Sequence, residues 1–297
     1  MKRIIIAVML FLSASNLIAQ SNVQQPETGI YQHFKELSSL PNPSRAWMDT
    51  IKFPPAEYGS SILFTLVRPY YLSSEQVQFL SKLTTPPANS SDRVRAELDY
   101  LLNLQSTRTA EQVERVKQLG DIGFWPQVAQ LLSHPDYQKT LKDLFFEPRS
   151  VLGREWAPEN LPQSTMLFKG IMQDDRVIEF TIKYKYLRAR PYHLEKNLQP
   201  LDRINSPSFA SGHSLWAYLQ AYVWGELIPS KKEQFLRLAD EIRQSREVMG
   251  IHYPSDNSAS RDIAFQMFMI YKKDPKFKID FEGARTELDK FAKKHNL

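Results

Sequence analysis

The chain has 297 residues, a formal net charge of +5 and no cysteine, and its 42% hydrophobic and 24% charged residues are ordinary globular proportions. These values exclude a disordered, collagen-like or disulfide-stapled protein, and the length allows one large domain with a sizeable core. The basic residues form no run longer than pairs such as Lys231-Lys232, which argues against a nucleic-acid-binding protein.

Residues 1–19 are predicted to be a secretory signal peptide. Two basic residues open the segment, an apolar run from Ile4 to Leu12 follows, and Ala19 is a small residue before a polar stretch. The apolar run is too short to span a bilayer, and there is no cysteine for a lipoprotein anchor. We therefore expect cleavage near Ala19 and a periplasmic or secreted mature protein with no integral membrane segment. An uncleaved anchor or a buried N-terminal helix is the alternative.

Residues 20–60 are predicted to be an N-terminal extended arm, because they are rich in Pro, Ser, Gln and Asn and have no sustained hydrophobic period. Docking on the rest of the chain would order part of this arm. The apolar run from Ser61 to Val67 fits either a strand or a buried helical turn, and periodicity does not decide between them.

From Ser73 onward the signals are helical. Capping-box spacing occurs at Ser73 and again at Thr109, while Pro126 and Pro135 each suit a first helical position. Amphipathic or apolar runs predict further helices over residues 94–102, 166–190, 215–228, 230–248, 256–272 and 282–295. With only 10 glycines in the chain, we expect residues 61–297 to form a single compact all-α domain of about nine or ten helices.

The first candidate motif for chemistry is Lys183-x6-Arg190-Pro191. The two cations are seven residues apart, so they share one face of the predicted helix, and the proline places Arg190 at the end of that helix. Two cations on one face can clamp a phosphate. A solvated basic face has the same pattern and is the structural alternative.

The second motif is Ser211-Gly212-His213, which lies just before the apolar run that begins at Leu215. Small residues at a helix start let free backbone N–H groups meet an anion, and the histidine then lies in the first turn beside that anion. An ordinary serine N-cap followed by a surface histidine is the alternative.

The third motif contains Ser245-Arg246 and, further on, His252 and Asp256. The histidine and the aspartate are four residues apart, so the carboxylate can reach the imidazole in a turn that leads into a helix. A carboxylate on one ring nitrogen fixes the tautomer and leaves the other nitrogen as a nucleophile or ligand. A surface ion pair is the alternative.

Taken together, the three motifs outweigh these alternatives. Their order and spacing, spread over residues 183–256, resemble the three-part signature of the phosphatidic acid phosphatase type 2 and vanadium haloperoxidase superfamily. The segments at residues 71–76 and 250–256 are similar to those of bacterial class A non-specific acid phosphatases, and the resemblance spans roughly residues 68–272. One departure is Ala210, because the family usually has proline before Ser-Gly-His.

The resemblance implies an exported acid phosphatase that hydrolyses small phosphomonoesters through a phosphohistidine intermediate, without a metal or other cofactor. It implies that His252 is the nucleophile, that Asp256 orients it, and that His213 acts as acid and then as base. It also implies a set of groups that bind the phosphoryl oxygens, namely Lys183, Arg190, Ser211, Gly212 and Arg246. Vanadate and other phosphate analogues are then expected to bind as inhibitors. A homo-oligomer is compatible with the sequence.

Three other functions stay open. A vanadate-dependent haloperoxidase would use the same anion site, although such chains are typically much larger. A lipid phosphate or pyrophosphate phosphatase is disfavoured by the lack of predicted membrane spans. A non-catalytic exported anion-binding module would require His252 or His213 to be misplaced.

Several polar residues outside the motifs are predicted to be structural. The pair Asp174-Asp175 is interpreted as part of a solvated helix face. The remaining histidines have no partner pattern and are interpreted as surface or locally satisfied residues, with His193 the candidate for a pocket rim. They are His33, His134, His193 and His295.

Overall fold

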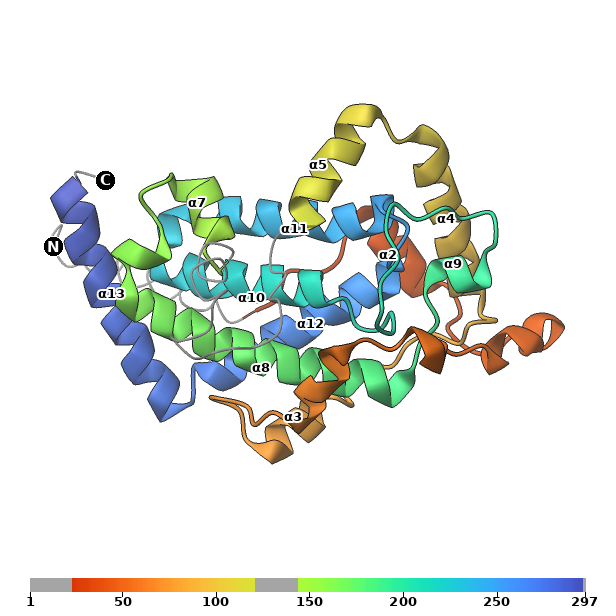
Figure 1. Cartoon of the computed structure of the whole chain (residues 1–297), viewed down its shortest axis with the longest axis horizontal. Helices are drawn as coiled ribbons and strands as arrows, with labels where there is room; N and C mark the ends of the chain where they lie inside the picture. Colours follow the sequence, from red (N-terminus) through yellow and green to blue (C-terminus); the bar gives the residue numbers. More distant parts are fainter. Residues whose placement is uncertain (1–22, 121–143, 296–297) are drawn as a thin grey trace, which may run out of the picture.

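Helices make up nearly all of the regular structure in the computed structural model, which describes residues 23–120 and 144–295 (Figure 1). Within these ranges no strand forms, and one isolated bridge joins Lys52 to Arg188. The all-α prediction is confirmed. The α-helices are α2 (Gly29–Glu36), α3 (Ser74–Leu80), α4 (Asp92–Thr107), α5 (Ala110–Gly120), α7 (Phe146–Leu152), α8 (Pro162–Tyr186), α9 (Pro191–Leu194), α10 (Gly212–Leu227), α11 (Lys232–Val248), α12 (Pro254–Tyr271) and α13 (Pro275–His295).

These described residues form eleven α-helices, against about nine or ten predicted from the whole sequence. The short helices α2, α7 and α9 account for the difference, because none is long enough to show a hydrophobic period. Helix α13 begins at Pro275 rather than at Glu282, since proline suits the first turn of a helix. The helices predicted to start at Pro126 and Pro135 lie outside the described residues.

The core is built around α10, which packs against α8, α11 and α12 (Figure 1). Nearly every residue of α10 is buried, including Trp216 and Trp224, because apolar side chains occupy all of its faces. Its first residue, Gly212, is therefore held at a fixed position beside the start of α12. Of the helices that the structure describes, none is long and apolar enough to cross a membrane.

Helix α8 is fixed at both ends. At its start Glu287 of α13 accepts hydrogen bonds from the backbone N–H groups of Gln163 and Ser164, both at 2.8 Å, and so satisfies two groups that a helix start leaves without partners. At its end Leu187 adopts a left-handed conformation with φ of 51°. This turn directs the chain away from the helix axis and into the segment that carries Arg188 and Arg190.

The acidic pair Asp174-Asp175 is not on a solvated helix face, and that prediction is wrong. Both side chains are fully buried, because α8 is surrounded by α10, α13 and the 3₁₀ helix η3 (Ser60–Leu66). Asp174 accepts the backbone N–H groups of Tyr70 and Tyr71, and burial raises its pKa to about 7. Asp174 thus joins the segment before α3 to α8.

The N-terminal segment docks along the domain and contains α2 and two 3₁₀ helices, η1 (Pro43–Thr50) and η2 (Pro55–Glu57). Buried Glu27 accepts two hydrogen bonds of 2.9 Å from the guanidinium of Arg243 on α11. The hydroxyl of Tyr31 donates to Glu247 of the same helix at 2.9 Å. Docking therefore orders this segment, as a short-helix structure rather than a uniformly extended one. The apolar run after it forms η3, so the helical alternative is right, but the turn is not buried as a whole, because Phe64 alone is buried while Leu63 and Leu66 are exposed.

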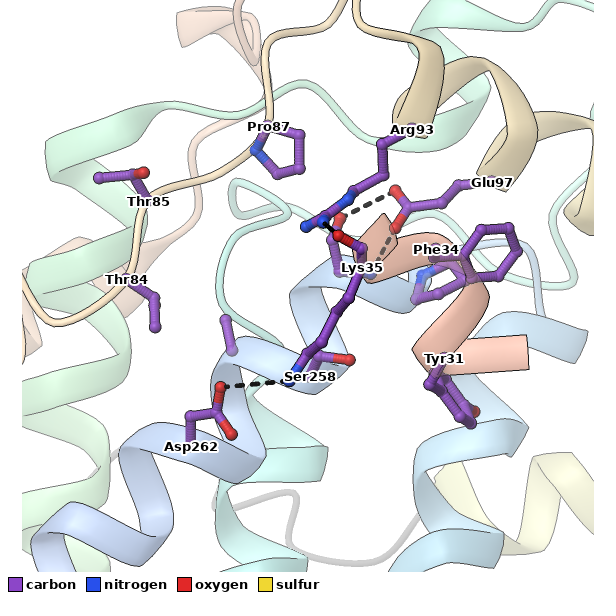
Figure 2. A pocket seen from close by; sticks show the side chains of 13 residues that line it. Tyr31, Phe34, Lys35, Thr84, Thr85, Pro87, Arg93, Glu97, Ser258 and Asp262 are labelled. Atoms are coloured by element: carbon purple, nitrogen blue, oxygen red, sulfur yellow. Dashed lines mark hydrogen bonds and ion pairs between the residues drawn. The ribbon is translucent and has the colours of Figure 1, made fainter. Parts of the chain in front are cut away.

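A cavity of about 90 Å³ lies between α2, the loop before α4 and the start of α12 (Figure 2). Lys35 bridges part of it, because its ammonium lies 3.8 Å from Asp262 and its backbone carbonyl accepts a hydrogen bond of 2.6 Å from Arg93. Glu97 forms the wall nearest the third motif, where it binds Ser255. The N-terminal segment therefore packs on the outer side of the residues that hold that motif.

Candidate active site

His252 and Asp256 face each other at the start of α12. The imidazole Nδ1 lies 3.1 Å from Asp256 Oδ2, which also accepts the backbone N–H of Tyr253, the N-cap of the helix, at 3.1 Å. Both side chains are buried. An ionised carboxylate only accepts hydrogen bonds, so Nδ1 carries the proton and Nε2 carries a lone pair. The four-residue spacing read from the sequence thus produces an oriented, neutral imidazole.

The second ring nitrogen of His252 meets Arg190. Guanidinium Nη1 lies 2.9 Å from Nε2 and also donates to the backbone carbonyl of Ile251 at 2.9 Å, while Nε donates to the carbonyl of Ser206 at 2.9 Å. A guanidinium only donates, which agrees with a lone pair on Nε2. Burial, reinforced by the charge of Arg190, lowers the pKa of His252 well below its ordinary value. Nε2 is therefore unprotonated and lies beside a cation, so it is available as a nucleophile or a ligand.

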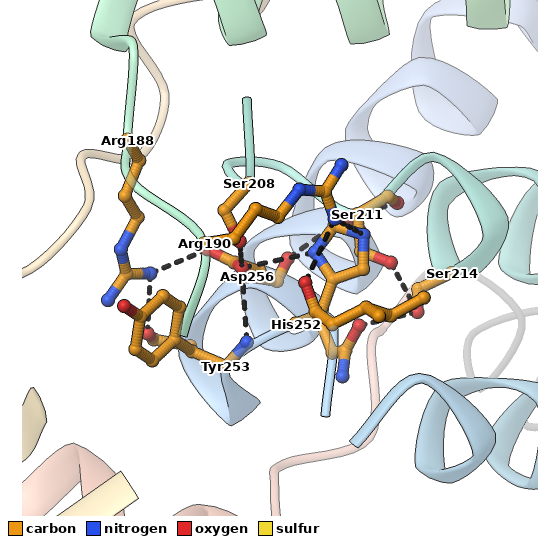
Figure 3. Close-up of polar contacts among 12 residues, drawn as sticks. Arg188, Arg190, Ser208, Ser211, Ser214, His252, Tyr253 and Asp256 are labelled. Carbon is orange, nitrogen blue, oxygen red and sulfur yellow. Dashed lines mark hydrogen bonds and ion pairs between the residues drawn. The ribbon is translucent and has the colours of Figure 1, made fainter. Parts of the chain in front are cut away.

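Asp256 is held by two residues that the motifs did not include, Arg188 and Ser208 (Figure 3). Arg188 Nη1 donates to one carboxylate oxygen and the Ser208 hydroxyl to the other, each at 2.5 Å. Burial alone would raise the pKa of Asp256, but the charge of Arg188 and the contact with His252 outweigh it and hold the pKa far below its ordinary value. The carboxylate beside His252 is thus held in its ionised form.

Arg188 also connects Asp256 to the buried carboxyl of Glu97. Its Nη2 lies 3.7 Å from Glu97 Oε2, and its guanidinium lies 3.9 Å from the ring centre of Tyr253. Glu97 in turn accepts the backbone N–H and the hydroxyl of Ser255, both at 2.8 Å. One signal for Arg188 was present in the sequence, since it lies two residues before Arg190 beyond the end of α8. Glu97 had none, because it is 159 residues away from Asp256 along the chain.

Replacing Arg188 with glutamine is expected to lower the free energy of unfolding by about 3–5 kcal/mol, because it leaves Asp256 without its buried counter-charge. Urea unfolding followed by circular dichroism measures this. The control is Arg95→Gln, which removes an exposed pair with Asp99 at 3.2 Å and should cost less than about 1 kcal/mol. Equal losses in the two variants would contradict a structural role for the Arg188–Asp256 pair.

Lys183 is buried on the last turns of α8 and binds the loop that precedes α10. Its Nζ donates to the backbone carbonyl of Pro207 at 2.7 Å and lies 3.4 Å from that of Ser208. Burial, with the nearby charge of Arg190, lowers the pKa of Lys183 to about 7. The same loop contains Ala210, which is buried where the family usually has proline. The first motif therefore holds the loop that leads into the second.

The second motif forms the start of α10. Ser211 is the N-cap, but its hydroxyl makes no capping bond and donates instead to Ser214 at 3.1 Å (Figure 3). The carboxylate of Glu179 lies against Gly212, since a Cβ added there would be 2.1 Å from Glu179 Oε1. A side chain at position 212 would force the Glu179 carboxylate to move away. Glu179 is also bound by Arg176, whose Nη1 lies 2.6 Å from Oε2.

His213 and Arg246 meet at the C-terminal turns of α5. His213 Nε2 lies 2.9 Å from the carbonyl oxygen of Gly120, which only accepts, so Nε2 carries the proton. Arg246 Nη2 donates to the carbonyl of Val116 at 3.2 Å, and Nε donates to Ser245 at 3.0 Å. Burial, with the charge of Arg246, lowers the pKa of His213 well below its ordinary value.

The predicted site residues thus lie around the starts of α10 and α12. Direct contacts link Arg190, His252 and Asp256, and the carboxylate of Glu179 joins Gly212 to Lys183, whose Nζ is 3.8 Å away. His213 and Arg246 approach from the α5 side. Sequence reasoning missed Arg188, Ser208, Glu97, Arg176 and Glu179. In the described parts of the chain, no group of three or more His, Asp or Glu side chains could hold a metal ion.

The other histidines can be placed in part. His193 Nδ1 accepts the backbone N–H of Arg190 at 3.2 Å, and Nε2 lies 3.2 Å from Glu57, so this side chain is locally satisfied beside the site. His33 is exposed on α2. His134 and the side chain of His295 lie outside the described residues.

Comparison with known proteins matches part of the chain to a family model. Residues 165–279 match the model of the PAP2 superfamily. The chain is 24% identical over 236 residues to the non-specific acid phosphatase of Providencia stuartii, covering 75% of this chain and 86% of that protein. It is also 24% identical over 231 residues to the non-specific acid phosphatase of Salmonella typhimurium, covering 75% of this chain and 85% of that protein.

Among solved structures, the fold is similar to that of a bacterial vanadium-dependent iodoperoxidase, with a TM-score of 0.52, 16% sequence identity and 85% of this chain covered. The chain spans 63% of the length of that protein. At this identity the likeness concerns the fold alone. The range matched by the family model holds every residue of the three motifs.

Proposed function

The chain carries a PAP2 superfamily domain over residues 165–279, and on this premise we propose that the protein is an exported acid phosphatase. Its substrates are small phosphate monoesters, and hydrolysis proceeds through a phosphohistidine intermediate without a metal. The observation that carries this proposal is the state of His252, whose Nδ1 is fixed by Asp256 at 3.1 Å and whose Nε2 lies beside Arg190 at 2.9 Å. The names of the two acid phosphatase relatives support the same activity.

In the first step, the lone pair of His252 Nε2 attacks phosphorus, so that a P–N bond forms and the P–O bond to the leaving alcohol breaks. The leaving oxygen takes a proton from His213. Asp256 stabilises the positive charge that develops on the His252 ring. In the second step, water attacks the phosphohistidine and gives a proton to His213. The P–N bond then breaks and releases inorganic phosphate.

Lys183, Arg190 and Arg246 are the cations available to the phosphoryl oxygens, together with the backbone N–H groups at the start of α10. Three cations facing a dianion supply the charge stabilisation that other phosphotransferases obtain from magnesium. For this to occur, the side chains must exchange partners, because Lys183 and Arg190 bind backbone carbonyls in the free protein.

Hydrolysis of p-nitrophenyl phosphate by the full-length protein tests the proposal. We expect turnover at acidic pH that is unchanged by a chelator and inhibited by vanadate. Activity that disappears in chelator and returns with a divalent ion would contradict a metal-free reaction. A protein that leaves phosphomonoesters intact but oxidises iodide or bromide with peroxide and vanadate would be a haloperoxidase instead.

Export belongs to the same proposal and depends on residues 1–19, which lie outside the described residues. We expect the protein recovered from the host that makes it to begin near Gln20. N-terminal sequencing of that protein measures this, and a mature chain that still begins at Met1 would contradict signal cleavage.

A further inference from the structure

The carboxylate of Glu179 lies against the start of α10, where the proposed reaction would bind the phosphoryl group. Glu179 lies on α8 one turn before Lys183, and its side chain is only 7% exposed. Its Oε1 lies against Gly212 at the start of α10, a 16-residue helix, and its Oε2 accepts a hydrogen bond of 2.6 Å from Arg176. The ammonium of Lys183 is 3.8 Å from Oε1.

A carboxylate and a phosphoryl group are bound by the same kinds of group at a helix start. Both are oxyanions, and both are favoured by free N–H groups at a helix start and by neighbouring cations. The charged and titratable groups that act on Glu179 are Asp175, Arg176, Lys183 and Tyr184 of α8, and Arg190 beyond it. Because Gly212 has no side chain, the carboxylate of Glu179 can lie directly against the helix start.

We propose that Glu179 determines the affinity of this enzyme for phosphate and phosphate esters by occupying the phosphoryl position in the free protein. The inference rests on the proposed function, since it takes the start of α10 as the phosphoryl site. A phosphoryl dianion cannot share the site with a second anion at contact distance. Substrate and product therefore bind only when the Glu179 side chain turns away from Gly212, and the apparent affinity is reduced by the fraction of molecules in that state.

The test compares binding of inorganic phosphate and of vanadate to the full-length protein and to Glu179→Gln by isothermal titration calorimetry. We expect the variant to bind both anions about tenfold more tightly or better, because an amide no longer competes as an anion. The matched control is Glu233→Gln on α11, which makes the same charge change at an exposed position. It should leave both dissociation constants within about twofold of wild type.

Equal or weaker binding by Glu179→Gln would overturn the proposal and would assign Glu179 to holding Arg176 and Lys183 in place. Thermal melting checks the fold of the variant, and Glu179→Ala provides a second uncharged side chain that should also tighten binding if Glu179→Gln does not fold. The readout is independent of turnover. Tighter binding without any phosphatase activity would refute the proposed reaction alone, whereas hydrolysis with unchanged phosphate affinity would refute the role of Glu179 alone.

Discussion

Replacing His252 with alanine is expected to abolish phosphoester hydrolysis, with a loss in kcat of about 10⁴-fold or more. The reason is chemical, because the variant has no Nε2 to form the covalent P–N bond and the remaining cations can only bind the substrate. Steady-state hydrolysis of p-nitrophenyl phosphate measures the loss. Rapid quenching with labelled substrate into alkaline denaturant, in which phosphohistidine survives, should trap labelled protein from the wild type and none from the variant.

The control for this experiment is His33→Ala, which removes an exposed histidine of α2 and should keep full activity. The fold of His252→Ala is checked by its circular dichroism spectrum, since the side chain is buried and bound to Asp256. A variant that retains most of the hydrolysis would show that His252 is not the nucleophile. A wild-type enzyme with normal turnover but no labelled intermediate under any quench time would argue for direct attack by water.

The sequence predicted the parts of the fold and site that depend on short-range order. Pro191 marks a helix boundary because proline lacks an N–H group and suits a first turn, and it begins α9 in the structure. The four-residue spacing of His252 and Asp256 lets the two side chains meet at the start of α12, as expected. The predicted shared helix face of Lys183 and Arg190 is wrong, because α8 ends at Tyr186 and Arg190 lies beyond it in extended backbone. The superfamily resemblance inferred from the same motifs is confirmed by the family model and by the named relatives.

The parts that the sequence could not predict depend on contacts between distant segments. Glu97 supports Arg188 only because α4 packs beside the start of α12, and a single sequence carries no signal for such a pairing. The acidic residues of α8 show a different error, in which the sequence predicted exposure and the structure shows burial. Charged side chains usually face solvent, which predicts an exposed Asp174-Asp175 pair, but this part of α8 is buried among neighbouring helices. Only the full arrangement of helices reveals that its polar residues face protein.

Glu179 is an intermediate case. Its position one turn before Lys183 is readable in the sequence, since residues four apart share a helix face. What the sequence does not show is that this face meets Gly212, because that contact depends on how α8 crosses α10. The sequence predicts an anion site at the second motif. In the folded chain the carboxylate of Glu179, from α8, already lies against that motif.

Replacing His213 with alanine is expected to slow hydrolysis of alkyl phosphates by about 10²–10⁴-fold, because an alkoxide leaves poorly without a proton from a general acid. The loss for p-nitrophenyl phosphate should be much smaller, since p-nitrophenolate is a stable anion. Parallel assays with an alkyl phosphate and p-nitrophenyl phosphate measure the difference. In the free protein the His213 Nε2 proton is directed to the Gly120 carbonyl, 2.9 Å away, so substrate binding must redirect it.

The pH dependence of kcat/KM tests the role of His213 as general acid independently. Burial and the charge of Arg246 lower the pKa of His213 well below its ordinary value, so in the free enzyme the ring loses its proton at acidic pH. The acid form is the one that the first step requires. The protonated form of His213 is lost as pH rises through this lowered pKa. We therefore expect kcat/KM for alkyl phosphates to fall while the pH is still acidic. In His213→Ala this descent should vanish. If the descent persists in His213→Ala and both substrates lose activity equally, another group is the acid, and His213 only binds the phosphoryl oxygens.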